Sequence, residues 1–144
     1  MSAYFDTPLL VKTYVWEEDS ARAVELVESC GMPLAFSHLH EVEIPNAIRL
    51  KGFRGEISSA QAAAAVRAFR DDIEQGRFVR PDYNLTAIFP RAEKLSMHYS
   101  LTLGTRSLDL LHVAAALEMR CDAFASLDVR QRKCAKREGL RCLL

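Results

Sequence analysis

The stretch Tyr4-Phe5-Asp6-Thr7-Pro8 decides how the chain is organised. Its first two residues are apolar and aromatic, as in a short buried strand, and an acid follows them directly. Thr is a good helix N-cap, and Pro is favoured in the first helical turn because its missing N–H has no helical partner there. The stretch therefore predicts a strand at Ala3–Phe5, a turn and a helix start. It places Asp6 at the carboxyl end of the strand, the edge at which open α/β sheets bind ligands.

Short apolar segments alternate with helical patterns along the rest of the chain. Further strands are predicted at Leu34–Phe36, Arg77–Arg80, Ala123–Ser126 and Cys142–Leu144. Between them, apolar residues recur three and four positions apart, which indicates helices. Strands that alternate with helices are typical of a parallel sheet covered on both faces. We therefore expect a three-layer α/β/α arrangement with a central parallel sheet, in a single domain of residues 1–144.

The composition is that of an ordinary globular chain without a dominant charge. Of its 144 residues, 49% are hydrophobic and 26% are charged, and the net charge at pH 7 is zero. A strongly basic balance, which would point to nucleic acid by itself, is absent. No apolar run approaches the roughly 18 residues of a membrane span, and the N-terminus lacks the pattern of a signal peptide. The four cysteines form no C-x-x-C pair. We expect a cytoplasmic protein with reduced cysteines and no membrane contact.

Three further acids, Glu43, Asp109 and Asp128, stand at points comparable to that of Asp6. Each of the four has a simple structural interpretation. Asp109 lies in the first turn of an apolar helix, where the helix dipole favours an anion. Asp128 directly follows a strand, as a helix N-cap does. Glu43 alone reads as an exposed helix acid, and Asp6 alone as a turn acid.

Taken together, the four acids can all point at one edge of the sheet. Carboxylates that meet repel one another and burial raises their pKa values, so such a cluster persists when cations bind it. Ligand sets made only of oxygen favour Mg²⁺ or Mn²⁺ over Zn²⁺. These ions suit the hydrolysis of phosphodiesters, because they activate water and stabilise the leaving oxygen.

The chain resembles the PIN-domain ribonucleases, and among them the VapC-type toxins of toxin–antitoxin pairs. The matching segments follow the family's order and are Tyr4–Lys12, Ser37–Ile48, Gly104–Leu117 and Ala125–Asp128. Two positions depart from the family's pattern. Pro8 stands where a Ser is usual, and Ser126 replaces the commoner Thr.

The resemblance implies a PIN-like fold and a Mg²⁺- or Mn²⁺-dependent endoribonuclease. The residues that it implies as metal ligands are Asp6, Glu43, Asp109 and Asp128, with Thr7 and Ser126 as supporting hydroxyls. It also implies an RNA substrate, a small VapB-like antitoxin as partner, and a homodimer.

Four further polar residues near these acids need an interpretation. We expect Arg106, three residues before Asp109, to contact phosphate. His112 lies on the same helix face as Asp109, where it either hydrogen-bonds near the site or fills the core. His38 and His40 resemble a metal pair, but they diverge on a helix and do not favour a zinc site.

Two other functions are compatible with parts of the pattern. In a phosphatase of the haloacid-dehalogenase type, Asp6 would be the nucleophile, but that chemistry needs a second acid at the position of Pro8. The other alternative is a PIN scaffold that binds RNA or protein without cleaving it. The presence of all four acids argues against that scaffold. A metal titration separates the scaffold from a metal-dependent enzyme, since a binding module need not respond to Mn²⁺.

Overall fold

The computed structural model describes residues 2–144, and the contacts within the chain divide it into two compact units. The first unit contains the residues up to Asp6 together with Arg80–Leu144, and the second is Thr7–Val79. The chain therefore passes between the units twice, at the peptide bonds Asp6–Thr7 and Val79–Arg80. The expectation of one domain for the whole chain stays a prediction.

The first unit contains three parallel strands. They are β1 (Ala3–Phe5), β4 (Ala123–Ala125) and β5 (Arg141–Cys142). The strand β4 lies between the other two, and its Ala123 is in register with Ala3 on one side and with Arg141 on the other. Every residue of β1 and β4 is buried, as expected for parallel strands covered on both faces. The rings of Tyr4 and Phe124 stack across this pair with their centroids 5.7 Å apart.

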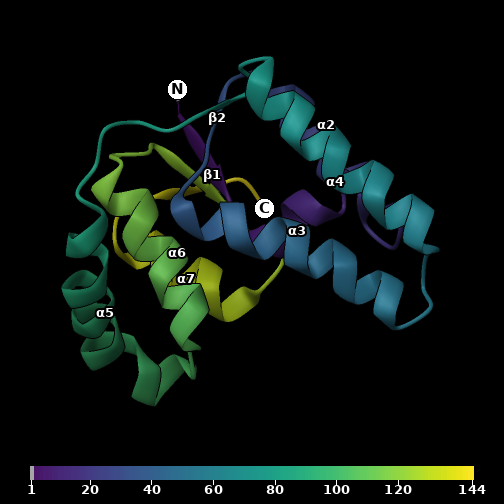
Figure 1. The fold of residues 1–144 in the computed structure, drawn as a ribbon. Helices are drawn as coiled ribbons and strands as arrows, with labels where there is room; N and C mark the ends of the chain where they lie inside the picture. The colour runs from purple at the N-terminus through teal and green to yellow at the C-terminus, as the bar shows by residue number, and fades with distance from the viewer. Residues whose placement is uncertain (1) are drawn as a thin grey trace. The chain divides into compact units, whose positions relative to one another are not determined.

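Helices complete the first unit. They are the short 3₁₀ helix η1 (Leu85–Ala87), α5 (Ile88–Leu103), α6 (Ser107–Glu118) and α7 (Val129–Arg137). Figure 1 shows α5 and α6 side by side. Residues 113–116 of α6 have no exposed surface, which fits a helix that is apolar on nearly every face. The helix α5 ends at Gly104, whose φ of 67° is a left-handed conformation that favours glycine.

The second unit contains two parallel strands and four helices. The strands are β2 (Leu34–Ala35) and β3 (Phe78–Val79), and the helices are α1 (Thr7–Val11), α2 (Ser20–Cys30), α3 (His38–Phe53) and α4 (Ser59–Glu74). Its core contains edge-to-face aromatic pairs, in which the ring of Phe78 contacts those of Phe69 and Phe36 at centroid distances of 5.6 and 5.7 Å. The helix α3 packs against both α1 and α4.

Local sequence signals explain how α3 and α4 begin. At the start of α4, the N–H of Gln61 donates to Ser58 Oγ at 3.0 Å, and the N–H of Ser58 donates to Gln61 Oε1 at 2.8 Å. This is a complete capping box. At the start of α3, the N–H of Ser37 donates to His40 Nδ1 at 3.0 Å. His40 is thus buried in a capping role.

The observed elements confirm the α/β fold class with parallel strands that the sequence predicts. All strand pairs within the two units are parallel, and helices follow the strands in the expected alternation. No helix among the described residues has both the length and the hydropathy that crossing a membrane requires.

Candidate functional site

Asp6 lies at the carboxyl end of β1 and is 3% exposed. Its N–H donates to the carbonyl oxygen of Ala125 at 3.0 Å, which continues the β1–β4 ladder by one residue and fixes the backbone of the acid. Its side-chain Oδ2 accepts a hydrogen bond from Ser126 Oγ at 2.6 Å. A bond of this length from a hydroxyl to a carboxylate is charge-assisted and strong. Ser126, one of the two hydroxyls implied as supporting groups, therefore contacts the first acid directly.

Ser126 also connects Asp6 to Asp128. The hydroxyl of Ser126 is fully buried and accepts a hydrogen bond from the N–H of Asp128 at 3.0 Å. Asp128 is the N-cap of α7, because its Oδ1 accepts from the N–H groups of Arg130 and Gln131 at 2.9 and 3.1 Å. The simple interpretation of Asp128 as a helix cap is thus confirmed. Asp128 can have a second role beside capping, since its other carboxylate oxygen, Oδ2, takes no part in the cap.

Arg106 lies against two of the acids. Its Nε donates to Asp109 Oδ2 at 3.0 Å, and its Nη2 is 3.7 Å from Asp128 Oδ2. The hydrogen bond to Asp109 and the negative charge of that residue raise the pKa of the Arg106 guanidinium. One cation of the chain is therefore shared between two carboxylates. The expected contact of Arg106 with phosphate stays a prediction.

His112 packs in the core of the first unit. Its Nδ1 is 2.7 Å from the hydroxyl oxygen of Tyr4, and the two rings meet edge to face with their centroids 5.8 Å apart. Tyr4 is fully buried and His112 is 2% exposed. Because Tyr4 precedes Asp6 by two residues on β1, this bond joins α6 to the strand that carries the first acid.

In the second unit, the structure brings Thr7 and Glu43 together. Thr7 Oγ1 donates to Glu43 Oε1 at 3.3 Å, between helices α1 and α3. Thr7 is buried and Glu43 is half-buried. Glu43 is thus contacted by the second hydroxyl that the resemblance implies, as Asp6 is contacted by Ser126.

The contacts connect the candidate residues in two sets. Asp6, Asp109 and Asp128 are linked through Ser126 and Arg106 in the first unit, and Thr7 is bonded to Glu43 in the second. Within residues 2–144, no group of three or more His, Cys, Asp or Glu side chains forms a ready metal-binding cluster. The donors that the chain offers are carboxylate and hydroxyl oxygens, and a cation already lies against two of the carboxylates. This donor set fits a hard divalent ion such as Mg²⁺, and binding by all four acids stays a prediction.

Gln131 is a further residue of this region that the motifs do not reveal. It is 1% exposed, and its Nε2 donates to the main-chain oxygen of Asp109 at 3.1 Å, which ties α7 to the first turn of α6. Its Oε1 is buried without a hydrogen-bond partner among the described residues. The only signal in the sequence is its position three residues after the N-cap Asp128, within a run of basic residues.

Comparison with known proteins finds a likeness in structure. No protein-family model matches the sequence, and no curated protein does. The crystal structure of FitAcB from Neisseria gonorrhoeae matches the chain with a TM-score of 0.61 at 16% sequence identity, over 100% of this chain and 97% of that chain. At this identity the likeness bears on the fold alone. It shows that the chain has the PIN-like α/β fold that its sequence motifs imply.

Proposed function

We propose that the chain is a Mg²⁺- or Mn²⁺-dependent endoribonuclease that acts in the cytoplasm as the toxin of a VapBC-type toxin–antitoxin pair. The observation that carries this proposal is the linked set of three aspartates in the first unit. The hydroxyl of Ser126 donates to the carboxylate of Asp6 and accepts from the backbone N–H of Asp128, and the carboxylates of Asp128 and Asp109 share the guanidinium of Arg106. The PIN-like fold and the ordered sequence motifs support the same function.

Each residue of the set has a role in the proposed reaction. Asp6, Asp109 and Asp128, together with Glu43, would hold the divalent cation. When bound, that cation supplies positive charge that polarises the phosphodiester and lowers the pKa of water. The residues that hold the acids in place are Ser126 for Asp6 and Thr7 for Glu43.

Arg106 has two successive roles in this proposal. Without a divalent ion, its guanidinium balances the charge of Asp109 and Asp128. With a divalent ion held by these acids, the guanidinium of Arg106 would be available to donate two parallel hydrogen bonds to a phosphate of the RNA. The side chain of Arg106 is 69% exposed, so it has room to turn toward a substrate.

The same contact suggests how an antitoxin inhibits. The position of Arg106 shows that a guanidinium fits against Asp109 and Asp128. We propose that a VapB-like antitoxin, bound to a homodimer of this chain, places an arginine of its own at these acids. A structure of the complex in which no cationic group of the antitoxin approaches Asp109 or Asp128 would contradict this mode of inhibition.

The experiment that tests the function is incubation of the purified protein with total cellular RNA, with Mg²⁺ or with EDTA, followed by mapping of new RNA ends. We expect discrete new ends in the Mg²⁺ reaction and none in EDTA. The alternative function, a PIN scaffold without catalysis, predicts RNA or protein binding with no new ends under either condition. This alternative is supported by the contacts that the acids already make within the chain, above all the ion pairs of Arg106 with Asp109 and Asp128.

A further inference from the structure

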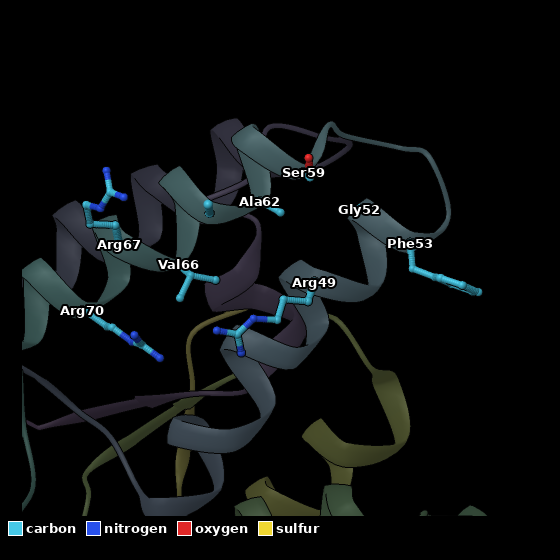
Figure 2. A pocket seen from close by; sticks show the side chains of 9 residues that line it. Arg49, Gly52, Phe53, Ser59, Ala62, Val66, Arg67 and Arg70 are labelled. Atoms are coloured by element: carbon cyan, nitrogen blue, oxygen red, sulfur yellow. The ribbon is translucent and has the colours of Figure 1, made fainter.

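A groove of about 600 Å³ lies between α3 and α4 of the second unit. Small side chains form much of its lining, among them Gly52, Ala62 and Val66. The larger lining residues are three arginines and one aromatic residue: Arg49, Arg67, Arg70 and Phe53. No acid lines the groove, so its charge is entirely positive. We call it the α3–α4 groove (Figure 2).

The arginines of the α3–α4 groove are exposed, and none forms an ion pair or a side-chain hydrogen bond within the described part of the chain. Two lysines of the same unit are paired. The Nζ of Lys12 lies 3.3 Å from Glu17 Oε1, and the Nζ of Lys51 lies 2.5 Å from Glu17 Oε2. The groove thus concentrates positive charge that the chain itself does not balance.

The directions of the side chains make the groove suitable for an anion. Figure 2 shows Arg49 on α3 and Arg70 on α4 with their guanidinium groups turned toward each other. Two like charges repel in this arrangement, and an anion placed between them relieves the repulsion. Each guanidinium offers a planar fork of donors that matches a phosphate.

An exposed aromatic ring stands at the same groove. Phe53 is the last residue of α3, is 87% exposed, and points away from the helix pair in Figure 2. An unstacked phenyl ring on the same helix as the unpaired Arg49, four residues further on, offers the two kinds of contact with which proteins bind single-stranded nucleic acid, because a ring stacks on a base while cations follow the backbone.

We propose that the α3–α4 groove binds single-stranded RNA, with Arg49 and Arg70 on a backbone phosphate and Phe53 stacked on a base. This inference rests on the proposed function in taking RNA as the substrate, and it adds a binding surface outside the aspartate set. An acidic protein segment would match the charge as well. RNA fits better, because the small side chains that line the groove offer a peptide no deep apolar pocket for an anchoring side chain.

Binding is tested with a fluorescein-labelled, unstructured RNA of about 12 nucleotides. Fluorescence anisotropy is measured in EDTA, so that cleavage cannot consume the probe. We expect the double variant Arg49→Gln/Arg70→Gln to bind about 10-fold more weakly at low salt. Its slope of log K against log salt should become shallower by about 0.7, which is the share of the one single-strand phosphate that both arginines neutralise. The matched control is Arg22→Gln, an exposed arginine on α2 of the same unit that does not line the groove, and it should bind like the parent.

Stacking is tested separately. Phe53→Ala should weaken binding about 5- to 150-fold, the range that corresponds to 1–3 kcal/mol for one stacked base, and should leave the salt slope unchanged. Phe89→Ala is the matched control, because Phe89 is an exposed phenylalanine of the first unit that lies outside the groove. Unchanged affinity in both groove variants overturns the proposal. Polyglutamate serves as a second probe that stands for an acidic protein segment. If the groove variants bind RNA like the parent but no longer bind polyglutamate, the groove is assigned to an acidic protein segment and the proposal is overturned.

Cleavage assays on the same variants keep this inference distinct from the proposed function. If the groove variants lose RNA binding while the parent protein cleaves no RNA in Mg²⁺, the proposed nuclease function is wrong and the proposed RNA binding by the groove is supported. If the parent cleaves RNA while the groove variants bind RNA as tightly as the parent, the proposed RNA binding by the groove is wrong and the nuclease function is supported.

Discussion

The aspartates of the first unit and the arginines of the α3–α4 groove differ in how their charge is balanced. Asp6, Asp109 and Asp128 each have a partner within their own unit, either a hydroxyl, a backbone N–H or a guanidinium. Arg49 and Arg70 face solvent without an ion pair among the described residues. One set of charges is held in a defined geometry before any ligand arrives, whereas the other is free to adapt.

This difference matches what each set is proposed to do. Chemistry at one phosphodiester needs acids that are already in position, because only a preorganised site avoids reorganisation during the reaction. A surface that holds an RNA backbone meets many similar phosphates and tolerates mobile side chains, although ordering each long side chain opposes binding by about 0.5–1.5 kcal/mol. The comparison predicts that substitutions among the aspartates abolish function, while substitutions in the groove only weaken it.

The largest effect is expected for Asp109→Asn. The amide keeps the size of the side chain but removes the charge that would bind the cation, so RNA cleavage should fall about 100-fold or more, since even the partners of metal ligands contribute 10- to 100-fold. Loss of the exposed ion pair with Arg106 should change stability by no more than about 1 kcal/mol. Cleavage assays and thermal melts on the same preparation measure both.

The matched control for this variant is Asp82→Asn, an exposed aspartate of the first unit outside the linked set. It should cleave RNA like the parent protein. A fully active Asp109→Asn protein would remove this residue from the catalytic set and would leave its ion pair with Arg106 as its role.

Mn²⁺ should stabilise the fold if the aspartates bind it. An ion that binds the native chain and not the unfolded one adds about 2.7 kcal/mol at a concentration of 100 Kd. We expect the melting temperature to rise with millimolar Mn²⁺ in the parent and to rise much less in Asp109→Asn. A melting temperature that responds to Zn²⁺ but not to Mn²⁺ would contradict a site built from oxygen ligands alone.

Ser126→Ala tests whether the geometry of the acids matters separately from their charge. It removes the hydroxyl that donates to Asp6 and accepts from Asp128 while leaving every carboxylate in place. We expect about 10- to 100-fold slower cleavage, as for other residues that orient metal ligands. The variant Ser126→Thr keeps the hydroxyl and should restore most of the rate. Equal rates for Ala and Thr at this position would show that the hydroxyl does not orient Asp6 for catalysis.

The smallest effect concerns Glu17, the acid that balances Lys12 and Lys51 in the second unit. Burial raises the pKa of Glu17, but the hydrogen bonds and charges of Lys51 and Lys12 outweigh it and hold the pKa below its ordinary value. A depressed folded-state pKa contributes stability above the unfolded pKa of about 4.3, and this stability is lost as the pH falls through the folded value. Glu17→Gln should therefore lower stability by at most about 1 kcal/mol at pH 7, and the difference should be smaller at pH 3, because protonation of the carboxylate removes its charge. Urea melts at the two pH values measure it, and a difference of the same size at pH 3 would point to packing instead of charge.

Much of the fold follows from local signals in the sequence. The apolar runs at β1 and β4 and the capping box at Ser58 predict their elements, because strand burial and helix capping depend on a few neighbouring residues. The 3₁₀ helix η1 is not predicted, because its three residues are too few to show a helical repeat, although its start has an equally local cap in Asn84, whose side chain accepts from the N–H groups of Thr86 and Ala87.

The candidate site is predicted in its residues but not in its contacts. The resemblance identifies Asp6 and Ser126 by type and order, and the structure supplies the 2.6 Å bond between them. The sharing of Arg106 between two acids and the buried position of Gln131 arise from helices that meet only in the folded unit, so no local pattern encodes them. The α3–α4 groove could not be predicted from the sequence for the same reason, because Arg49 and Arg70 lie on different helices.

The discontinuity of the first unit has a consequence for biosynthesis. Asp6 and the hydroxyl that orients it, on Ser126, are separated by 120 positions in the chain. A ribosome adds about 5–20 residues per second, so roughly 6–24 seconds pass between the synthesis of Asp6 and that of Ser126. The segment Thr7–Val79 is synthesised without interruption during that interval, whereas β1 has no strand of its own unit to pair with until β4 is complete. The aspartate set of a nascent chain therefore cannot assemble before Ser126 has been synthesised, so the ribonuclease activity proposed for this set cannot act on the ribosome before that point.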